Sequence, residues 1–299
     1  MDQIARTSPS AGFLRRLRRG AVGWMLSPSL GFLIFFFLLP AIVFFIYSFL
    51  VSQYYRVEWQ LTWNNYYRTF TTPVYLQAML NSLRIGLTAG LATTLMSYPF
   101  AYFLTFRLKR GRNLVLFLVV ISLLGSYLVR VYAWRTILGK AGAINSFLLM
   151  IGVIKEPLLF LLFSRLAVLL TLVHVFLPFA ILPIMSSLQN IPWDLVEAAR
   201  DLGCNPLQAF LKVTLPLSIT GVLSGFGYTF ILSAADYITP QLVGGTSSAM
   251  IGLSITNQFV KVGNMGLGSS LSFVLLAVLV LAYLAIRFLA RLAKLTPRQ

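Results

Sequence analysis

Long apolar runs separated by short polar segments are the feature that most restricts the fold of this chain of 299 residues. Hydrophobic residues make up 58% of the sequence and charged residues only 10%, whereas a soluble domain carries roughly 25% charged residues. A lipid bilayer offers no water to satisfy backbone polar groups, so an apolar segment of about 20 residues crosses it as a helix. The sequence therefore predicts an all-α integral membrane protein.

Six such segments predict six transmembrane helices. Each is long enough to cross a hydrocarbon core of about 30 Å, and they cover residues 25–50, 79–106, 112–137, 165–189, 217–238 and 269–291. The first contains Pro40 and the fourth contains Pro178 and Pro183. Proline bends a membrane helix where neighbouring groups satisfy the freed carbonyl. We expect a basic amino-terminal arm over residues 1–24 and a transmembrane domain over residues 25–299.

The distribution of Lys and Arg predicts the orientation of these helices. With the amino terminus in the cytoplasm, the inner segments hold 15 of the 24 Lys and Arg residues and the outer segments hold nine. Cytoplasmic loops of membrane proteins carry such an excess. We therefore expect both termini in the cytoplasm, and residues 190–216 as a cytoplasmic loop between the fourth and fifth helices. The outer segments would be an aromatic-rich interfacial stretch at 51–78, a partly inserted loop at 138–164, and a Gly-, Ser- and Thr-rich stretch at 239–268.

Composition also excludes several classes of protein. A net charge of +17 would suggest a nucleic-acid partner for a soluble protein, but here the cytoplasmic loops account for it, and we expect no nucleic-acid binding. The single cysteine, Cys204, and the single histidine, His174, allow no internal disulfide and no metal-ligand spacing. The Arg-rich start resembles a signal peptide, but the following apolar run is too long and lacks a small-residue cleavage site.

The loop 190–216 holds three of the seven acidic residues in the chain, Asp194, Glu197 and Asp201. Pro192 favours a helix start, and on a helix from Trp193 to Leu202 these acids share one face. The opposite face is small and apolar, with Leu195, Ala198, Ala199 and Leu202.

Gly203 follows this helix, where a left-handed cap is expected, and Asn205 with Pro206 predicts the start of a second short helix ending near Thr214. Such a helix pair is too short to span a bilayer. It either lies on the membrane as a plain interfacial loop or docks into a groove on a partner protein.

One motif in this loop resembles a known family. Glu197-Ala198-Ala199, three residues, Gly203, nine residues and then Val213-Thr214-Leu215-Pro216 resembles the EAA motif of bacterial ABC importer permeases. The family pattern has Ile at the position of Val213, which is a mild departure. The resemblance implies that this loop is a coupling helix that fits a cleft on an ATP-binding subunit, with Glu197, Ala198, Ala199, Gly203, Leu215 and Pro216 as its motif residues.

The resemblance extends over nearly the whole chain and is closest to permeases of the spermidine/putrescine type. It rests on Asn81-Ser82-Leu83, on residues 129–134 (VRVYAW) and on residues 236–245 (DYITPQLVGG). It implies a MetI-like fold in the bacterial inner membrane, two ATP-binding subunits, a second permease subunit, for which the family favours a paralogue, and a periplasmic substrate-binding protein. It also implies that ATP and Mg²⁺ bind in the partner ATPase and that this chain carries no cofactor.

Asp236 is the one acid that the sequence places at membrane depth, and intramembrane acids are costly enough to suggest a function. A carboxylate beside the ring of Tyr237 could receive a passing ammonium group through charge and cation–π attraction. The alternative is a structural ion pair with Arg84 or Arg130. We expect Asp236 to help a cationic substrate through the membrane.

Five further positions complete the set of residues that the sequence singles out. His174 lies in the middle of the fourth span, where a hydrogen bond to a neighbouring helix is the first expectation and a gating or pH role the second. Tyr132 and Trp134 are suited either to the outer cavity or to an interfacial aromatic belt. Gly221 and Gly225, four residues apart, favour close packing of helices.

Other functions find less support in the sequence. No G-x-x-x-x-G-K-[ST] loop occurs, and no G-x-S-x-G, H-E-x-x-H or paired-carboxylate arrangement is present, so we expect a subunit that is not itself an enzyme. A stand-alone secondary transporter or channel remains the alternative. It would typically contain several buried ionisable groups and an internal repeat, and we detect no repeat.

Overall fold

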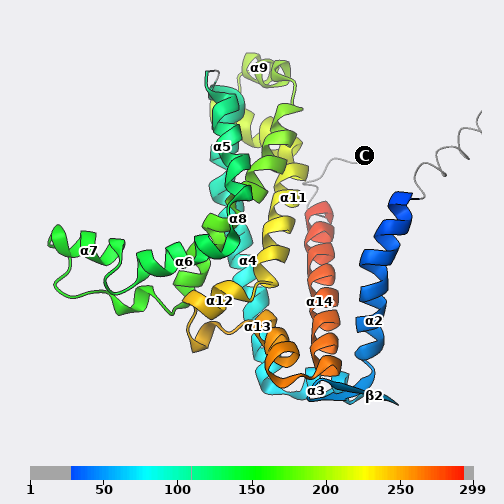
Figure 1. The fold of residues 1–299 in the computed structure, drawn as a ribbon. Coiled ribbons are helices and arrows are strands. Elements are labelled where there is room, and N and C mark those ends of the chain that lie inside the picture. Colours follow the sequence, from blue (N-terminus) through cyan, green and yellow to red (C-terminus); the bar gives the residue numbers. More distant parts are fainter. Residues whose placement is uncertain (1–27, 109, 293–299) are drawn as a thin grey trace, which may run out of the picture.

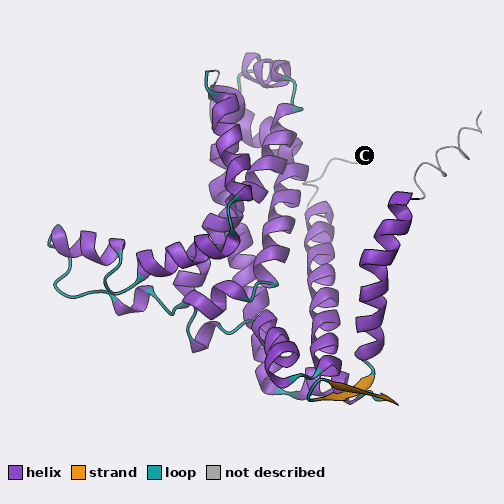
Figure 2. Cartoon of the chain, in the orientation of Figure 1, coloured by secondary structure: helices purple, strands orange, loops and turns teal. Residues whose placement is uncertain are grey.

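Helices build almost all of the described chain, and one small hairpin is the exception (Figures 1 and 2). The computed structural model describes residues 28–108 and 110–292, so the predicted basic arm 1–24 lies outside the described residues. In that part of the chain, β1 (Leu50–Gln53) pairs antiparallel with β2 (Arg56–Leu61), with Gln53 opposite Arg56. The two turn residues, Tyr54 and Tyr55, both have positive φ. The prediction of an all-α protein is thus correct apart from this hairpin.

The remaining elements follow in chain order and include several π-helical and 3-10 turns, labelled η. They are η1 (Ile34–Leu38), α2 (Leu39–Tyr47), α3 (Asn64–Thr71), α4 (Pro73–Tyr102), η2 (Phe103–Arg107), α5 (Arg112–Leu124), α6 (Tyr127–Leu138), α7 (Ala143–Met150), η3 (Leu159–Leu161), α8 (Arg165–Gln189), α9 (Trp193–Asp201), α10 (Pro206–Ala209), η4 (Phe210–Thr214), α11 (Leu215–Ala234), α12 (Ile238–Val243), η5 (Thr246–Ser248), α13 (Ile251–Thr256), η6 (Asn257–Val262) and α14 (Met265–Leu292).

Four of the described helices are long and apolar enough to cross a membrane. They cover Pro28–Tyr47, Arg165–Gln189, Pro206–Ala234 and Met265–Ala290, and they match the first, fourth, fifth and sixth predicted spans. A fifth span arises if a bent helix pair that begins at Arg112 is counted as one crossing. The second predicted span corresponds to α4, whose 30 residues make it the longest described helix but which is not among these apolar helices.

Helices α4, α8 and α11 pack side by side as the central bundle of the molecule (Figure 1). Small residues let their backbones approach: Gly86 and Gly90 of α4 face Ala234 and Phe230 of α11. On the other side of α11, Gly221 and Gly225 lie against α8. The predicted packing role of this glycine pair is confirmed. Without an apolar driving force between helices in lipid, close contact of this kind is what holds such a bundle together.

The third predicted span, 112–137, is wrong as a single straight helix. Helix α5 ends at Leu124, α6 begins at Tyr127, and the segment continuing through α7 to Met150 is bent by 95° from α5. Gly125 and Ser126 at the junction have extended backbone with ψ of 140° and 127°. Hydropathy cannot detect this break because both flanking segments are apolar. In Figure 1, α6 and α7 project sideways from the central bundle.

The fifth predicted span, 217–238, begins too late and ends too late. One helix runs from Pro206 to Ala234 without interruption, so the second short helix expected to stop near Thr214 is the first part of this span. The π-turn η4 ends just before Pro216, and the amide of Leu215 donates to the carbonyl of Phe210. This wider turn accommodates a proline that would otherwise clash with the preceding turn.

The three segments that the sequence predicts to lie on the outer side contain regular structure. In the stretch 51–78, the side-chain amide of Asn65 on α3 donates to the carbonyls of Ser48 and Leu50, at 3.0 and 2.9 Å, and so ties α3 to the end of α2. The stretch 138–164 contains α7, and the stretch 239–268 contains α12 and α13. Figure 1 places β2 and α3 at one end of the molecule and α9 at the other.

The packing of α11 on α8 predicts that Gly221 tolerates no side chain. A methyl group at Gly221 would lie 2.6 Å from the carbonyl oxygen of Pro183 and even closer to the side chain of Ser187. We expect Gly221→Ala to destabilise the fold by about 1–3 kcal/mol, as overpacking does in tight cores. The measurement is the thermal unfolding midpoint of the purified chain in detergent. The control is Gly31→Ala, because a methyl group there meets nothing within 4 Å; equal midpoints for the two variants would contradict the packing role.

Candidate functional site

In the loop between α8 and α11, hydrogen bonds within the loop cap the helix ends. At the end of α9, the amide of Gly203 donates to the carbonyl of Arg200 at 2.9 Å, and the amide of Cys204 donates to the carbonyl of Ala199 at 3.0 Å. Gly203 has φ of +87°. These two bonds and the left-handed residue between them form a Schellman cap, which confirms the predicted glycine stop.

The next helix begins with a reciprocal cap, also as the sequence predicts. The side chain of Asn205 accepts from the amide of Gln208 at 2.8 Å, the side chain of Gln208 accepts from the amide of Asn205 at 3.1 Å, and Pro206 occupies the first turn. Both helix ends thus satisfy their own backbone groups, and hydrogen bonds within the loop stabilise the shape of the α9–α10 corner.

Helix α9 buries little and exposes most of its side chains. Val196 is its buried residue, and the ring of Trp193 packs on Phe106 with centroids 5.0 Å apart. The predicted apolar face points to solvent: Leu202 is 87% exposed and Leu195 is 46% exposed. The acids Asp194, Glu197 and Asp201 are also exposed. An apolar ridge flanked by carboxylates, at the tip of the molecule (Figure 1), is a surface suited to docking into a groove.

The six motif residues fall into two groups. Glu197 and Ala198 are exposed on α9, Ala199 is half-buried, and Gly203 forms the turn. Leu215 and Pro216 lie in the first turn of α11, half-buried. The first group therefore forms the exposed tip, whereas the second lies within the continuous helix that joins this tip to the bundle.

Trp134 and His174 come together at the crossing of α6 and α8. The indole Nε1 of Trp134 donates to Nδ1 of His174 at 3.0 Å, and their rings meet edge to face with centroids 5.6 Å apart. The expected hydrogen bond between His174 and a neighbouring helix is confirmed, with His174 as the acceptor. Tyr132, two residues before Trp134 on the same helix, is exposed and takes no part in this contact.

Asp236 is 9% exposed and lies just after the end of α11. Its two carboxylate oxygens accept from the amides of Ile238 and Thr239, at 3.2 and 3.0 Å. This is the pattern of a side chain that caps the start of a helix, and neither arginine considered from the sequence supplies these bonds. The adjacent Tyr237 is 40% exposed.

Arg130 has a structural role that the sequence alone did not indicate. Its guanidinium donates to the carbonyls of Gly125 and Val175, both at 3.2 Å. Gly125 lies at the break between α5 and α6, and Val175 lies in the turn of α8 that precedes Pro178. The hydroxyl of Tyr127 meets that of Thr239 at 2.7 Å, so α6 is also tied to α12. The side chains of α6 therefore connect three elements of the bundle.

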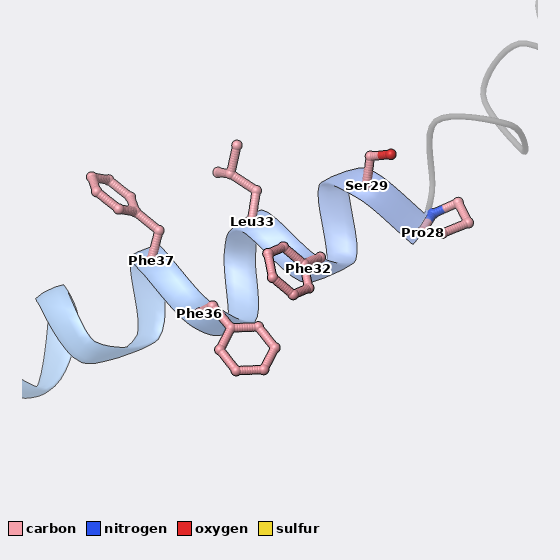
Figure 3. A pocket seen from close by; sticks show the side chains of 6 residues that line it. All are labelled: Pro28, Ser29, Phe32, Leu33, Phe36 and Phe37. Carbon is pink, nitrogen blue, oxygen red and sulfur yellow. The ribbon is translucent and has the colours of Figure 1, made fainter. Parts of the chain in front are cut away.

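Two of the hollows along the described residues are open grooves with mostly apolar linings. Of the hollows along the described chain, one of about 820 Å³ runs beside the first turns of the helix Pro28–Tyr47, and its six described lining residues, all from that helix, are drawn in Figure 3. A groove whose described lining comes from one helix alone does not define a binding site. A second hollow of about 300 Å³ lies beside His174 and Pro178 and is lined mostly by apolar side chains. Within residues 28–108 and 110–292, no group of three His, Cys, Asp or Glu residues could hold a metal ion.

A bundle of apolar helices with an exposed, self-capped helix corner at one end is suited to a membrane transport component. Comparison with known proteins agrees. A family model described as "Binding-protein-dependent transport system inner membrane component" matches residues 97–295. The chain belongs to this family.

Within this family, the chain is similar to permeases of one kind of transport system. The chain is 33% identical over 256 residues to the spermidine/putrescine transport system permease protein PotB of Escherichia coli strain K12, covering 85% of this chain and 92% of that protein. It is 34% identical over 257 residues to the protein of the same name from Haemophilus influenzae, covering 84% and 88%.

The fold also has a solved counterpart. The structure resembles a chain of a bacterial ABC transporter involved in the import of the acidic polysaccharide alginate, with a TM-score of 0.71 and 16% identity, over 94% of this chain and 99% of that one. At this identity the likeness concerns the fold alone.

The contact between Trp134 and His174 predicts a measurable coupling between α6 and α8. Hydrogen bonds between membrane helices contribute about 0.6 kcal/mol on average in double-mutant cycles, and we expect a coupling energy of that order here. The measurement is a cycle of Trp134→Phe, His174→Phe and the double variant, with unfolding followed in mixed micelles. Additive effects of the two substitutions would show that the hydrogen bond contributes nothing.

Proposed function

We propose that this chain is the permease subunit of an ATP-driven importer, forms half of the translocation pathway, and carries a small cationic solute of the polyamine type. The observation that carries the proposal is the exposed corner of α9 and Gly203, which bears the EAA residues and continues through α10 into the apolar helix Pro206–Ala234. The names of the two relatives, both spermidine/putrescine permeases, support the substrate class.

The corner is suited to receive force from a partner. Because Leu195 and Leu202 are exposed, docking would remove apolar surface from water. The carboxylates of Asp194, Glu197 and Asp201 would complement basic groups at the rim of a groove. Movement of the docked corner would be passed along the continuous helix to α12, because a packed helix transmits displacement as a rigid element.

The partners follow from this role. The chain would work with two ATP-binding subunits, in which ATP and Mg²⁺ bind, with a second permease subunit, and with a periplasmic substrate-binding protein. The solved alginate transporter in complex with a substrate-bound periplasmic protein has the same fold, with a TM-score of 0.72. We infer a paralogue as the second permease from the family resemblance.

The expected topology is six spans with both termini in the cytoplasm. The four long apolar helices, the bent pair beginning at Arg112 and α4 would together make six crossings. In Figure 1, the start of the described helix Pro28–Tyr47 and the end of α14 both point toward the end of the molecule that carries α9. This arrangement supports a cytoplasmic α9 and cytoplasmic termini together.

The test of the proposal is transport by the reconstituted complex. Proteoliposomes containing this chain, its partner subunits and the binding protein should take up radiolabelled putrescine only with ATP inside, and the chain alone should not transport. In Gly203→Val, a branched side chain at positive φ strains the cap by about 1–2 kcal/mol and adds bulk at the docking surface. We expect this variant to lose transport and to co-purify poorly with the ATPase, while it still inserts into the membrane.

The matched control is Gly152→Val. Gly152 lies just after the end of α7. Gly152 has φ of +73°, and a side chain there, as at Gly203, meets nothing within 4 Å. The two substitutions thus carry the same conformational strain at different surfaces. Normal transport by Gly203→Val, or an equal loss in both variants, would count against α9 as the coupling helix. Uptake by the chain alone without ATP would favour a secondary transporter or channel.

The contacts of Asp236 decide which substitution tests its role in the pathway. An amide in place of the carboxylate would turn a donor toward one of the two backbone N–H groups, so Asp236→Asn would disturb the start of α12 as well as remove the charge. Serine can cap a helix without a charge. If the charge assists a cationic solute, Asp236→Ser should lower the initial rate of putrescine uptake while the unfolding midpoint stays close to that of the natural chain. Unchanged uptake would assign Asp236 to capping alone.

A further inference from the structure

Four aromatic side chains connect helix α9 to the central bundle, and we call them the aromatic ladder. They are Trp193 of α9, Phe106 of η2, Tyr102 of α4 and Phe210 of η4. The ring centroid of Phe106 lies 5.0 Å from that of Trp193 and 5.0 Å from that of Tyr102. The rings of Tyr102 and Phe210 follow, with centroids 5.9 Å apart. At these distances aromatic rings attract each other beyond the effect of the area that they bury.

The ladder leads to a hydrogen bond between two helices of the bundle. The ring of Phe210 also packs on that of Tyr98, one turn before Tyr102 on α4, with centroids 5.6 Å apart. The hydroxyl of Tyr98 lies 2.8 Å from that of Ser218 on α11. Because the hydroxyl of Ser218 already donates to the carbonyl of Leu215, Tyr98 is the donor in this bond. The contacts therefore run from the exposed helix α9 to α4 and from there to α11.

Two π-turns lie on the ladder, since η2 contains Phe106 and η4 begins with Phe210. Such turns within α-helices are frequent at functional sites. In α4 the hydroxyls of Thr93 and Thr94 donate to carbonyls four residues earlier, both at 2.7 Å. The buried hydroxyl of Thr105 in η2 has no partner among the described residues. An α-helical turn would supply that bond, so a second arrangement of η2 offers a hydrogen bond that the present one lacks.

We propose that the aromatic ladder couples α9 to α4, so that movement of the docked corner displaces α4 together with α11. The inference rests on the proposed role of α9 as the coupling helix, and it makes Trp193, Phe106 and Phe210 positioning residues for transport. The backbone joins the corner directly to α8 and α11, whereas α4 lies far away in the sequence. Closely packed side chains have low compressibility and transmit strain. A displaced α9 therefore moves η2, and with it the end of α4, through the ring of Phe106.

The first test separates coupling from assembly. The complex of this chain with its ATPase subunits, second permease and binding protein is reconstituted in nanodiscs, and ATP hydrolysis is measured with and without putrescine-loaded binding protein. Phe106→Leu keeps most of the apolar volume but removes the ring between Trp193 and Tyr102. We expect this variant to co-purify with the ATPase and to keep its basal hydrolysis. The stimulation by loaded binding protein should fall by about tenfold, which corresponds to about 1.4 kcal/mol of coupling.

Two further sets of variants show whether the contact itself matters. Phe103 lies on the same π-turn but is 51% exposed and outside the ladder, so Phe103→Leu should leave the stimulation unchanged. Phe106→Trp crowds the contact and Trp193→Phe shortens it, whereas the double variant exchanges the two rings. The double variant should be stimulated more strongly than either single variant, and this cycle also decides the matter if Phe106→Leu does not assemble. Additive effects in the cycle, or an equal loss in Phe103→Leu and Phe106→Leu, would overturn the proposal.

Comparison with Gly203→Val distinguishes failure of the ladder from failure of the proposed function. The expected result is that both Gly203→Val and Phe106→Leu lose putrescine uptake, and that only Gly203→Val co-purifies poorly with the ATPase. Loss of uptake in Gly203→Val together with full stimulation in Phe106→Leu would overturn the ladder and leave α9 as the coupling helix. Normal uptake in both variants would overturn the ladder and the proposed role of α9 together.

Discussion

Satisfying backbone hydrogen bonds without water is the constraint on which the rest of this structure depends. At the break after α5 a side chain supplies a hydrogen bond, and before Pro40 and Pro216 the turn widens. The guanidinium of Arg130 donates both to the carbonyl of Gly125 at that break and to the carbonyl of Val175 in α8. In lipid, an unsatisfied carbonyl costs several kcal/mol. One side chain therefore connects the break before α6 to α8.

Prolines within the spans show the same constraint in the backbone itself. The π-turn η1 ends two residues before Pro40, and η4 ends two residues before Pro216. In each case the amide after the π-turn reaches five residues back, from Leu39 to Ile34 and from Leu215 to Phe210. The wider turn leaves room for the proline ring without ending the helix. As a result the corner at Gly203 and the outer end at Ala234 are joined by one helix of 29 residues, about 43 Å long at 1.5 Å per residue.

The sequence predicted best what depends on neighbouring residues. The bounds of α9, the left-handed Gly203 and the cap at Asn205 follow from signals within a few positions, and the structure has each of them. Hydropathy is also a local signal, and it predicted the positions of the long apolar helices. The bend at Gly125 was not predicted because hydropathy averages over both flanking helices. The role of Arg130 was not predicted because its acceptor at Val175 lies 45 residues away in the sequence. Arg84 and Arg165 are 81 positions apart, so only the packing of α4 on α8 reveals that they share a cavity.

The structure gives the charged residues of the apolar segments a different environment from the one that the sequence predicts. The sequence directs attention to Asp236 because a lone intramembrane acid suggests a site for a cation. In the structure its carboxylate accepts two backbone amides and is nearly buried, which spreads its charge over the start of α12. The exposed charges at the α4–α8 cavity are both positive. A lone acid in an apolar segment is therefore not by itself a site for a cation, because backbone amides can bind both of its oxygens.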